Sequence, residues 1–147
     1  MQNLEDRMDK AREFAVKAHG DQMYGKFKYS YHLDQVKSEL MKLEHSGWDV
    51  HEDAYVVAYL HDVLEDTDVT IQEMFEFSSD VRWAVVLLTK VEIDYDLGKY
   101  LETIKSCKIA RIVKLADTLC NLQASINSVE PKRIKKYAEQ LAKLMED

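Results

Sequence analysis

The segment AYLHDVLEDTD, residues 58–68, combines one imidazole with several carboxylates in otherwise apolar surroundings. Its charged side chains at positions i, i+1, i+4 and i+5 are His61, Asp62, Glu65 and Asp66. On one helix these four would share a face about 140° wide, where burial without a partner would be costly. Imidazole and carboxylate groups suit Mn²⁺, Fe²⁺, Co²⁺ or Zn²⁺, so a divalent cation is a fitting partner. A solvated acidic helix end accounts for the spacing equally well.

Two further candidates lie elsewhere in the chain. In VKLADTLCNL, residues 113–122, Asp117 stands among apolar side chains. A carboxylate in that setting needs a metal or a hydrogen-bonded cation, and an ion pair with Lys114 or Arg111 is the alternative. His32 follows an aromatic-rich segment at a predicted helix start, where a single histidine is more often a cap or a core hydrogen-bond donor.

Helices are the elements predicted to position these residues. Only 4 Gly and 1 Pro argue against a turn-rich β-sandwich, and long stretches rich in Ala, Leu, Glu and Lys favour helices. Apolar periodicity and caps predict helices over Leu4 to about Gly20, Leu33 to Gly47, Glu52 to Leu64, a short one after Thr70, one capped by Ser79, Lys99 to Ser106, Ile109 to Ile126, and one opened by Pro131. Residues 20–31 are predicted to form a loop and residues 91–98 a connector. We therefore predict an all-α fold with a single domain over residues 1–147.

Some elements carry finer predictions. The helix from Glu52 is apolar on most sides, which predicts a central position. Thr70 with Glu73 has the pattern of a capping box. In the last helix, the run KRIKK (132–136) is predicted to be solvated. The buried face of that helix is predicted to consist of Ile134, Ala138, Leu141 and Leu144/Met145.

The composition of the whole chain limits its partners. A formal net charge of -7 disfavours non-specific binding to nucleic acid but is compatible with a local basic pocket for a phosphate-bearing small molecule. Cys107 and Cys120 are too few for a disulfide framework, which favours a reducing compartment. Glu5, Asp6 and Arg7 interrupt any apolar N-terminal run, and no apolar run is long enough for a membrane span. We expect a cytoplasmic protein without nucleic-acid or membrane partners, whose oligomeric state the sequence does not indicate.

Five segments occur in an order that resembles a known family. They are AREFAVKAH (11–19), YSYHLDQV (29–36), AYLHDVLEDTD (58–68), LLTK (87–90) and VKLADTLCNL (113–122). Together they are similar to the hydrolase domain of the RelA/SpoT family, and especially to its small stand-alone alarmone hydrolases. The resemblance covers about residues 11 to 124 and implies an HD-type helical bundle.

The resemblance also implies a role for each matching residue. His32, His61, Asp62 and Asp117 match the family's four metal ligands, which usually hold Mn²⁺. Glu65 and Asp66 match the acidic pair that orients and activates water, and Asn121 matches a residue that helps to hold the nucleotide. The implied reaction removes the 3′-pyrophosphate from guanosine tetra- or pentaphosphate, the alarmones of the stringent response. No synthetase segment follows, so hydrolysis without synthesis is expected.

The sequence departs from the family pattern around the expected base pocket. Met23 and Tyr24 stand where the family has an adjacent Arg and Lys, and that Arg is the residue expected to stack on guanine. Lys28 and Leu33 replace two family prolines, and Ala124 replaces a Thr that contacts substrate. The candidates left for substrate binding are Tyr24, Lys26, Lys28, Tyr29 and Asn121.

Three hypotheses follow from these observations. The first is a Mn²⁺-dependent alarmone pyrophosphohydrolase. The second keeps the chemistry but changes the substrate to another nucleotide, such as a deoxynucleotide, a nucleoside triphosphate or NADPH. The third is a metal-binding module that senses a nucleotide without turnover. The intact pair of Glu65 and Asp66 argues against the third hypothesis, because a pure binder does not need to activate water.

Overall fold

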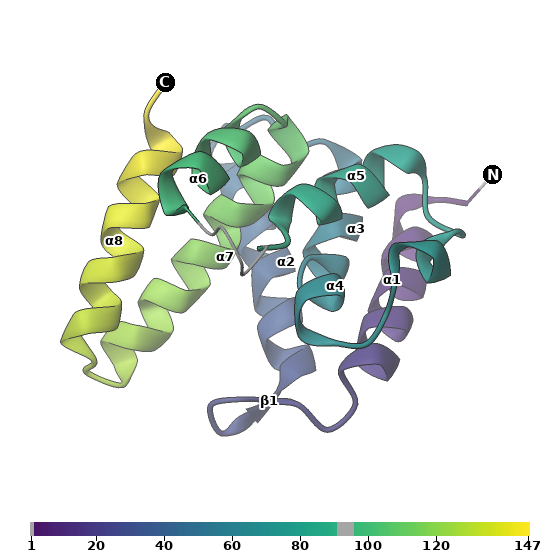
Figure 1. The fold of residues 1–147 in the computed structure, drawn as a ribbon, viewed down its shortest axis with the longest axis horizontal. Coiled ribbons are helices and arrows are strands. Elements are labelled where there is room, and N and C mark those ends of the chain that lie inside the picture. Colours follow the sequence, from purple (N-terminus) through teal and green to yellow (C-terminus); the bar gives the residue numbers. More distant parts are fainter. Residues whose placement is uncertain (1, 91–95) are drawn as a thin grey trace.

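Helices make up most of the backbone in the computed structural model, which describes residues 2–90 and 96–147. They are α1 (Leu4–His19), α2 (Tyr29–His45), α3 (Glu52–Leu60), α4 (Val63–Asp66), the 3₁₀-helix η1 (Ile71–Met74), α5 (Ser79–Leu88), α6 (Leu97–Lys105), α7 (Lys108–Asn127) and α8 (Pro131–Met145). Two short strands, β1 (Met23–Tyr24) and β2 (Phe27–Lys28), pair in an antiparallel hairpin below α1 and α2 (Figure 1). The predicted all-α class is confirmed.

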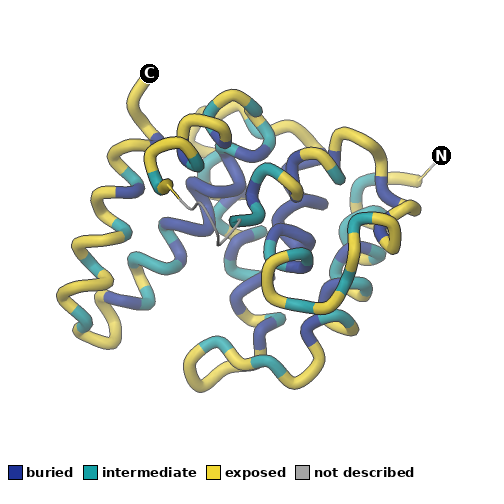
Figure 2. Tube along the Cα trace, in the orientation of Figure 1, coloured by how far each residue is buried: buried dark blue, intermediate teal, exposed yellow. Residues whose placement is uncertain are grey.

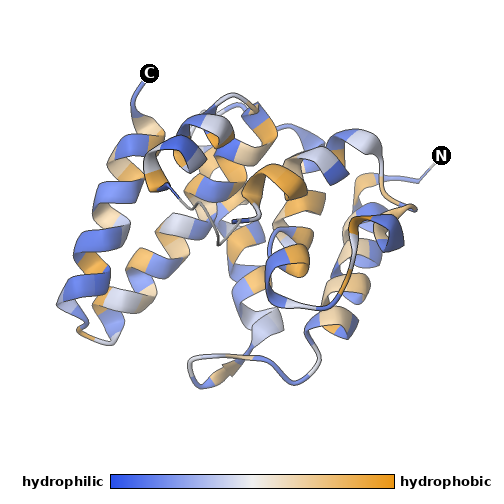
Figure 3. Ribbon diagram, in the orientation of Figure 1, coloured by the Kyte–Doolittle hydropathy of each residue, from blue (hydrophilic) through white to orange (hydrophobic). Residues whose placement is uncertain are grey.

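The core is built around α3, as its apolar sequence predicts. Every α3 residue from Asp53 to Leu60 is buried, and the helix packs against α1, α2, α5 and α7 (Figure 2). The hydropathy colouring follows the same division, with apolar residues along α3 and α5 and mostly polar ones along the outer side of α8 (Figure 3). This central position of α3 matters for function because the His61–Asp62 pair comes directly after it.

The start of α2 differs from the prediction. Residues 20–31 were expected to form a loop before a helix from Leu33, but the chain turns in a hairpin at Gly25 (φ +58°) and α2 begins at Tyr29. The Tyr29 N–H donates to the carbonyl of Gln22 at 3.1 Å, which closes the loop around the hairpin. The buried stripe of α2 therefore includes Tyr29 and His32. Because both side chains carry polar atoms, the periodicity of apolar residues did not indicate that they are buried.

The helix predicted over residues 52–64 is interrupted. It ends at Leu60, and α4 begins only at Val63. His61 Nδ1 lies 2.7 Å from the Ala58 carbonyl oxygen. In a continuous α-helix this carbonyl would instead accept the backbone N–H of Asp62. Asp62 has φ -102° and ψ 0°, outside regular helix geometry. The break places His61 and Asp62 at a helix end rather than along a helix face.

Two other boundaries shift by one or two residues. The cap of α5 is Ser78 rather than Ser79, because Ser78 Oγ accepts the Val81 N–H at 3.3 Å. Asp96 caps α6, so this helix begins two residues before the predicted Lys99. Most of the predicted connector, residues 91–95, lies outside the described residues. The short element after Thr70 has the predicted capping box, although it is a 3₁₀-helix.

The buried face of α8 also differs from the prediction. Ala138 and Met145 are exposed, whereas Leu144 and the polar Gln140 are buried against α7. Gln140 Nε2 donates to Thr118 Oγ1 at 2.7 Å, and this buried bond explains how an amide is accommodated there. Within the described part of the chain, no helix is both long and apolar enough to cross a membrane.

Candidate metal centre

Three buried side chains from distant parts of the chain converge. His32 lies in the first turns of α2, His61 follows α3, and Asp117 lies in the middle of α7. One ligand atom from each lies within 4.8 Å of the others, and all three residues are at most 4% exposed. His32 Nε2 is 2.9 Å from Asp117 Oδ1, and His61 Nε2 is 3.4 Å from the same oxygen.

Asp62 connects this cluster to the acidic pair. Its Oδ2 lies 3.0 Å from His61 Nε2. Its carboxylate also groups with those of Glu65 and Asp66, each offering an oxygen within 4.8 Å of the others. The six residues expected to be metal ligands or catalytic groups are therefore adjacent, although α4 rather than a continuous helix presents the acidic pair.

The distances between these donor atoms fit a shared divalent ion. Nitrogen and oxygen ligands lie about 2.0–2.2 Å from such a metal, so two of them stand about 3.0 Å apart at right angles and about 3.4 Å apart in a tetrahedron. The observed separations of 2.9, 3.0 and 3.4 Å match this range. Imidazole and carboxylate donors suit a first-row divalent metal.

The orientation of His61 supports the same fit. Its Nδ1 faces the Ala58 carbonyl at 2.7 Å and must carry the proton, because a carbonyl can only accept. Its Nε2 is buried and lacks a partner of hydrogen-bonding geometry among the described residues. A metal-binding histidine usually donates its other ring N–H to a carbonyl or carboxylate, as Nδ1 of His61 does here.

Tyr24 contacts His32 of the cluster, and Asn121 contacts Asp117. The Tyr24 ring stacks on the imidazole of His32 with the centroids 4.3 Å apart. Tyr24 Oη donates to Asn121 Oδ1 at 2.6 Å, and Asn121 Nδ2 reaches Asp117 Oδ1 at 3.3 Å. Both polar ends of Asn121, expected to hold a nucleotide, are therefore engaged within the protein.

Tyr29 lies elsewhere than expected. It was predicted as a loop aromatic for substrate binding, but it is only 8% exposed in the first turn of α2. Its ring stacks on His19 with centroids 4.2 Å apart, and its hydroxyl donates to Asp62 Oδ2. One face of the ring is thus covered by His19, although Tyr29 also borders the inner cavity described below.

The alternative partner considered for Asp117 is also present. Lys114 Nζ lies 3.2 Å from Asp117 Oδ2, and both side chains are buried. Burial would raise the pKa of Asp117, but the Lys114 charge and the two imidazoles lower this pKa well below its usual value. Burial would likewise lower the pKa of His61, but the charges of Asp62 and Asp117 raise it well above 6.5. The cluster thus attracts positive charge strongly, and a divalent ion that binds there would displace a proton.

The acidic pair is more open than the cluster. Glu65 and Asp66 are both exposed, and Glu65 Oε1 accepts the Lys90 N–H at 2.7 Å. Partial burial, followed by the charges of Asp62 and Glu65, raises the pKa of Asp66 to about 6. Both carboxylates can therefore be reached by water beside the cluster.

A cavity of about 190 Å³, here called the inner cavity, opens onto these groups. It is lined by Tyr24, Tyr29, His32, Asp62, Glu65, Asp66, Lys90, Lys114, Asp117, Asn121, Lys136, Tyr137 and Gln140. Its lining combines three ammonium groups, those of Lys90, Lys114 and Lys136, with four carboxylates. The ammonium groups suit a phosphate group, and the carboxylates suit a metal ion. Lys136, the last residue of KRIKK, is exposed as predicted but also borders this cavity, and so do the α8 residues Tyr137 and Gln140, which were not predicted as site residues. Their i, i+1 and i+4 spacing was the sequence feature that could have indicated a shared face.

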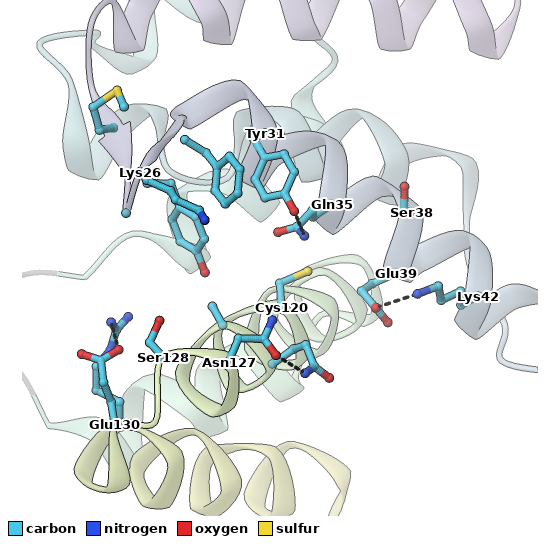
Figure 4. Close-up of a pocket in the computed structure, with 17 residues that line it drawn as sticks. Lys26, Tyr31, Gln35, Ser38, Glu39, Lys42, Cys120, Asn127, Ser128 and Glu130 are labelled. Carbon is cyan, nitrogen blue, oxygen red and sulfur yellow. Dashed lines mark hydrogen bonds and ion pairs between the residues drawn. The ribbon is translucent and has the colours of Figure 1, made fainter.

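A second cavity of about 900 Å³, here called the outer cavity, adjoins the first at Tyr24, which borders both. Figure 4 shows its walls, with Lys26, Tyr31 and Gln35 on one side and Asn127, Ser128 and Glu130 on the other. The remaining lining residues are Met23, Tyr24, Gly25, Phe27, Ser38, Glu39, Lys42, Cys120, Gln123, Ala124 and Arg133. Of the two lysines predicted to bind substrate, Lys26 lines this cavity, whereas Lys28 is exposed and lines neither cavity.

No family model matches the chain. Its structure is similar to a solved structure described as a metazoan ortholog of SpoT that hydrolyzes ppGpp and plays a role in starvation responses. The TM-score is 0.74 at 22% sequence identity, and the match covers 95% of this chain and 85% of the other. At this identity the likeness shows that the two chains share the all-α HD-domain fold.

Proposed function

We propose that this chain is a metal-dependent phosphohydrolase that removes the 3′-pyrophosphate from guanosine 3′,5′-bis(diphosphate) or its pentaphosphate analogue. The observation that carries the proposal is the convergence of His32, His61, Asp62 and Asp117 beside Glu65 and Asp66. Similarity in fold to a protein that hydrolyzes ppGpp supports the same reaction. All these residues belong to one proposed HD-type domain over residues 1–147.

The proposed ligands are His32, His61, Asp62 and Asp117, holding one divalent ion. We propose Mn²⁺ on the resemblance to alarmone hydrolases, because the donor set itself also suits Fe²⁺, Co²⁺ and Zn²⁺. When bound, such an ion lowers the pKa of water and screens charge on a phosphoryl group. Carboxylates on both sides of His61 supply the negative charge that would retain it.

The protein's own groups account for the proton and charge movements. Water attacks the phosphorus bonded to ribose O3′ and that P–O bond breaks. The products are pyrophosphate and GDP from the tetraphosphate, or pyrophosphate and GTP from the pentaphosphate. Glu65 or Asp66, whose carboxylates lie beside Asp62, accepts the proton of the water, and the leaving ribose oxygen gains one. The ammonium groups of Lys90 and Lys136 at the inner cavity offset the charge of the diphosphate.

The remainder of the nucleotide is proposed to occupy the outer cavity. Its volume of about 900 Å³ is large enough for a nucleoside with a second diphosphate. Tyr24 stands where the two cavities meet and offers an aromatic edge, while Lys26 supplies a cation. Asn121 uses one lone pair and one N–H in its bonds to Tyr24 and Asp117, so its second lone pair and second N–H remain for a nucleotide.

A second candidate is the same chemistry on another nucleotide. Met23 lines the outer cavity where a guanidinium would offer hydrogen bonds to guanine, and a thioether cannot donate them. Aromatic surfaces such as Phe27 bind bases with little discrimination, at about 1–3 kcal/mol per stacked base. Deoxynucleotides, nucleoside triphosphates and NADPH are therefore the alternative substrates to test.

The experiment is a nucleotide panel incubated with the Mn²⁺-loaded protein, with products identified by mass. Asp62→Ala protein, purified in the same way, measures the background from contaminating phosphatases. GDP and pyrophosphate from guanosine 3′,5′-bis(diphosphate) are the expected products. Turnover of another nucleotide alone would establish the second candidate, and tight binding without products would indicate a sensing module.

A further inference from the structure

Tyr29 contacts the candidate metal centre through Asp62, one of the proposed ligands. Its hydroxyl donates to Asp62 Oδ2, the same oxygen that lies 3.0 Å from His61 Nε2. A carboxylate oxygen has two lone pairs. The tyrosine O–H occupies one of them and leaves the other for the cluster, so this hydrogen bond fixes the direction in which Asp62 presents its oxygen.

The position of the Tyr29 hydroxyl is itself fixed by packing. The ring is buried and lies against His19 at the end of α1, with an interplanar angle of 29°. His19 Nδ1 donates to Gln22 Oε1 at 2.8 Å, which holds the imidazole in place. The ring also makes an edge contact with His32, one turn further along α2. Packing against α1 and within α2 therefore determines where this hydroxyl points.

We propose that Tyr29 is a positioning residue that holds the Asp62 carboxylate in its ligating orientation and thereby raises the affinity of the centre for its metal. This inference rests on the proposed metal-dependent function and assigns Tyr29 to the metal centre rather than to the nucleotide. Removing a hydrogen-bonding partner of a metal ligand typically weakens metal binding by about 10- to 100-fold. Asp62 precedes α4, and its side chain makes no capping hydrogen bond to that helix.

The test is the Mn²⁺ affinity of metal-free Tyr29→Phe protein, measured by calorimetry. This substitution removes one oxygen and retains the ring that stacks on His19. The matched control is Tyr59→Phe, which removes another buried tyrosine-to-carboxylate bond, from Tyr59 to Asp34 at 3.1 Å, away from the cluster. We expect the Kd for Mn²⁺ to rise about 10- to 100-fold in Tyr29→Phe and to stay unchanged in Tyr59→Phe. Thermal unfolding of each metal-free variant verifies that it is folded.

A double-mutant cycle shows whether Tyr29 acts through Asp62. In an Asp62→Ala background, adding Tyr29→Phe should leave the Kd for Mn²⁺ unchanged, because the carboxylate it positions is gone. An equal loss in both backgrounds, or wild-type affinity in Tyr29→Phe alone, would overturn the inference while leaving the metal centre intact. A folded wild-type protein that binds no Mn²⁺ would instead overturn the proposed function, and the inference with it.

Discussion

The ion pair between Lys114 and Asp117 gives Asp117 two roles. Its Oδ1 faces both imidazoles, while its Oδ2 faces the buried ammonium of Lys114. A carboxylate divided in this way is held rigidly, because each oxygen has its own partner. The lysine also keeps Asp117 ionised, which a metal ligand must be.

Asp117 has a buried lysine partner, and this separates it from the other proposed aspartate ligand, Asp62, in a testable way. Asp62→Ala and Asp117→Ala should both purify with far less metal than the wild type. Only Asp117→Ala leaves the buried Lys114 without its anion, and a broken buried pair typically costs about 3–5 kcal/mol. Urea unfolding of the metal-free proteins should therefore show a large loss of stability in Asp117→Ala and a smaller one in Asp62→Ala. Full metal content in both variants would contradict the ligand assignment.

Glu65 should affect turnover more than metal retention. In Glu65→Gln the side chain keeps an oxygen that can accept the Lys90 N–H, so local structure should survive. Loss of a general base typically lowers the rate by about 10²- to 10⁴-fold. We expect metal-loaded protein with kcat reduced by that order, measured by pyrophosphate release alongside metal analysis. Wild-type kcat in this variant would remove Glu65 from the mechanism.

The candidate metal ligands could be predicted from the sequence, whereas the residues that surround them could not. Charged groups on apolar segments single out His61 and Asp117, because burial demands a partner. Tyr29 and Lys136 could not be assigned in this way. Their roles depend on how α1 and α8 pack against the cluster, and a single helix pattern does not contain that information.

At the scale of elements, the hairpin of β1 and β2 places Tyr24 at the border of the two cavities. It brings Tyr24 onto His32 and against Asn121 on α7, so residues far apart in sequence close the inner cavity together. The sequence predicted an aromatic loop here but not its strands, because two-residue strands carry no periodicity. The same limit explains why the α3 break escaped prediction: it depends on a side-chain bond from His61 to the backbone.

Tyr24→Ala should weaken nucleotide binding more than it slows the chemistry. The substitution removes a ring that borders both cavities, and a lost ground-state contact raises KM with little change in kcat. Trp83→Ala on the exposed surface of α5 is the control and should behave as wild type. Steady-state kinetics on the substrate found in the nucleotide panel measure both. A fall in kcat at unchanged KM would place Tyr24 in the reaction itself.

The contact between α1 and α2 should contribute to stability in a pH-dependent way. Burial would raise the pKa of Asp34, but the hydrogen bond and charge of Arg12 outweigh it, and this pKa is lowered. A depressed carboxyl pKa stabilises the fold above the unfolded value of about 3.9 and ceases to do so as pH falls through the folded value. Both side chains are over 40% exposed, so the effect should be about 1 kcal/mol or less. Urea unfolding of wild type and Asp34→Asn should differ at pH 7 and converge below pH of about 4; a constant difference would contradict this.

At the scale of the whole molecule, a negative net charge does not exclude lysines from the centre. The chain carries a formal charge of -7, yet Lys90, Lys114 and Lys136 gather at the inner cavity. Composition was compatible with a local group of cations, but only the packing of α8 against α7 shows that Lys136 belongs to it. The fold class was predictable because helical periodicity extends over most of the chain, whereas both cavities arise from tertiary contacts.

The most direct test of the central claim follows metal binding and chemistry together. Metal-free protein is titrated with Mn²⁺ in the presence of guanosine 3′,5′-bis(diphosphate), and bound metal, GDP and pyrophosphate are measured at each step. We predict that GDP and pyrophosphate appear in equal amounts, at a rate that rises with occupancy and levels off at one ion per chain. Fully loaded protein that leaves the nucleotide intact, or that releases single phosphates instead of pyrophosphate, would contradict the account.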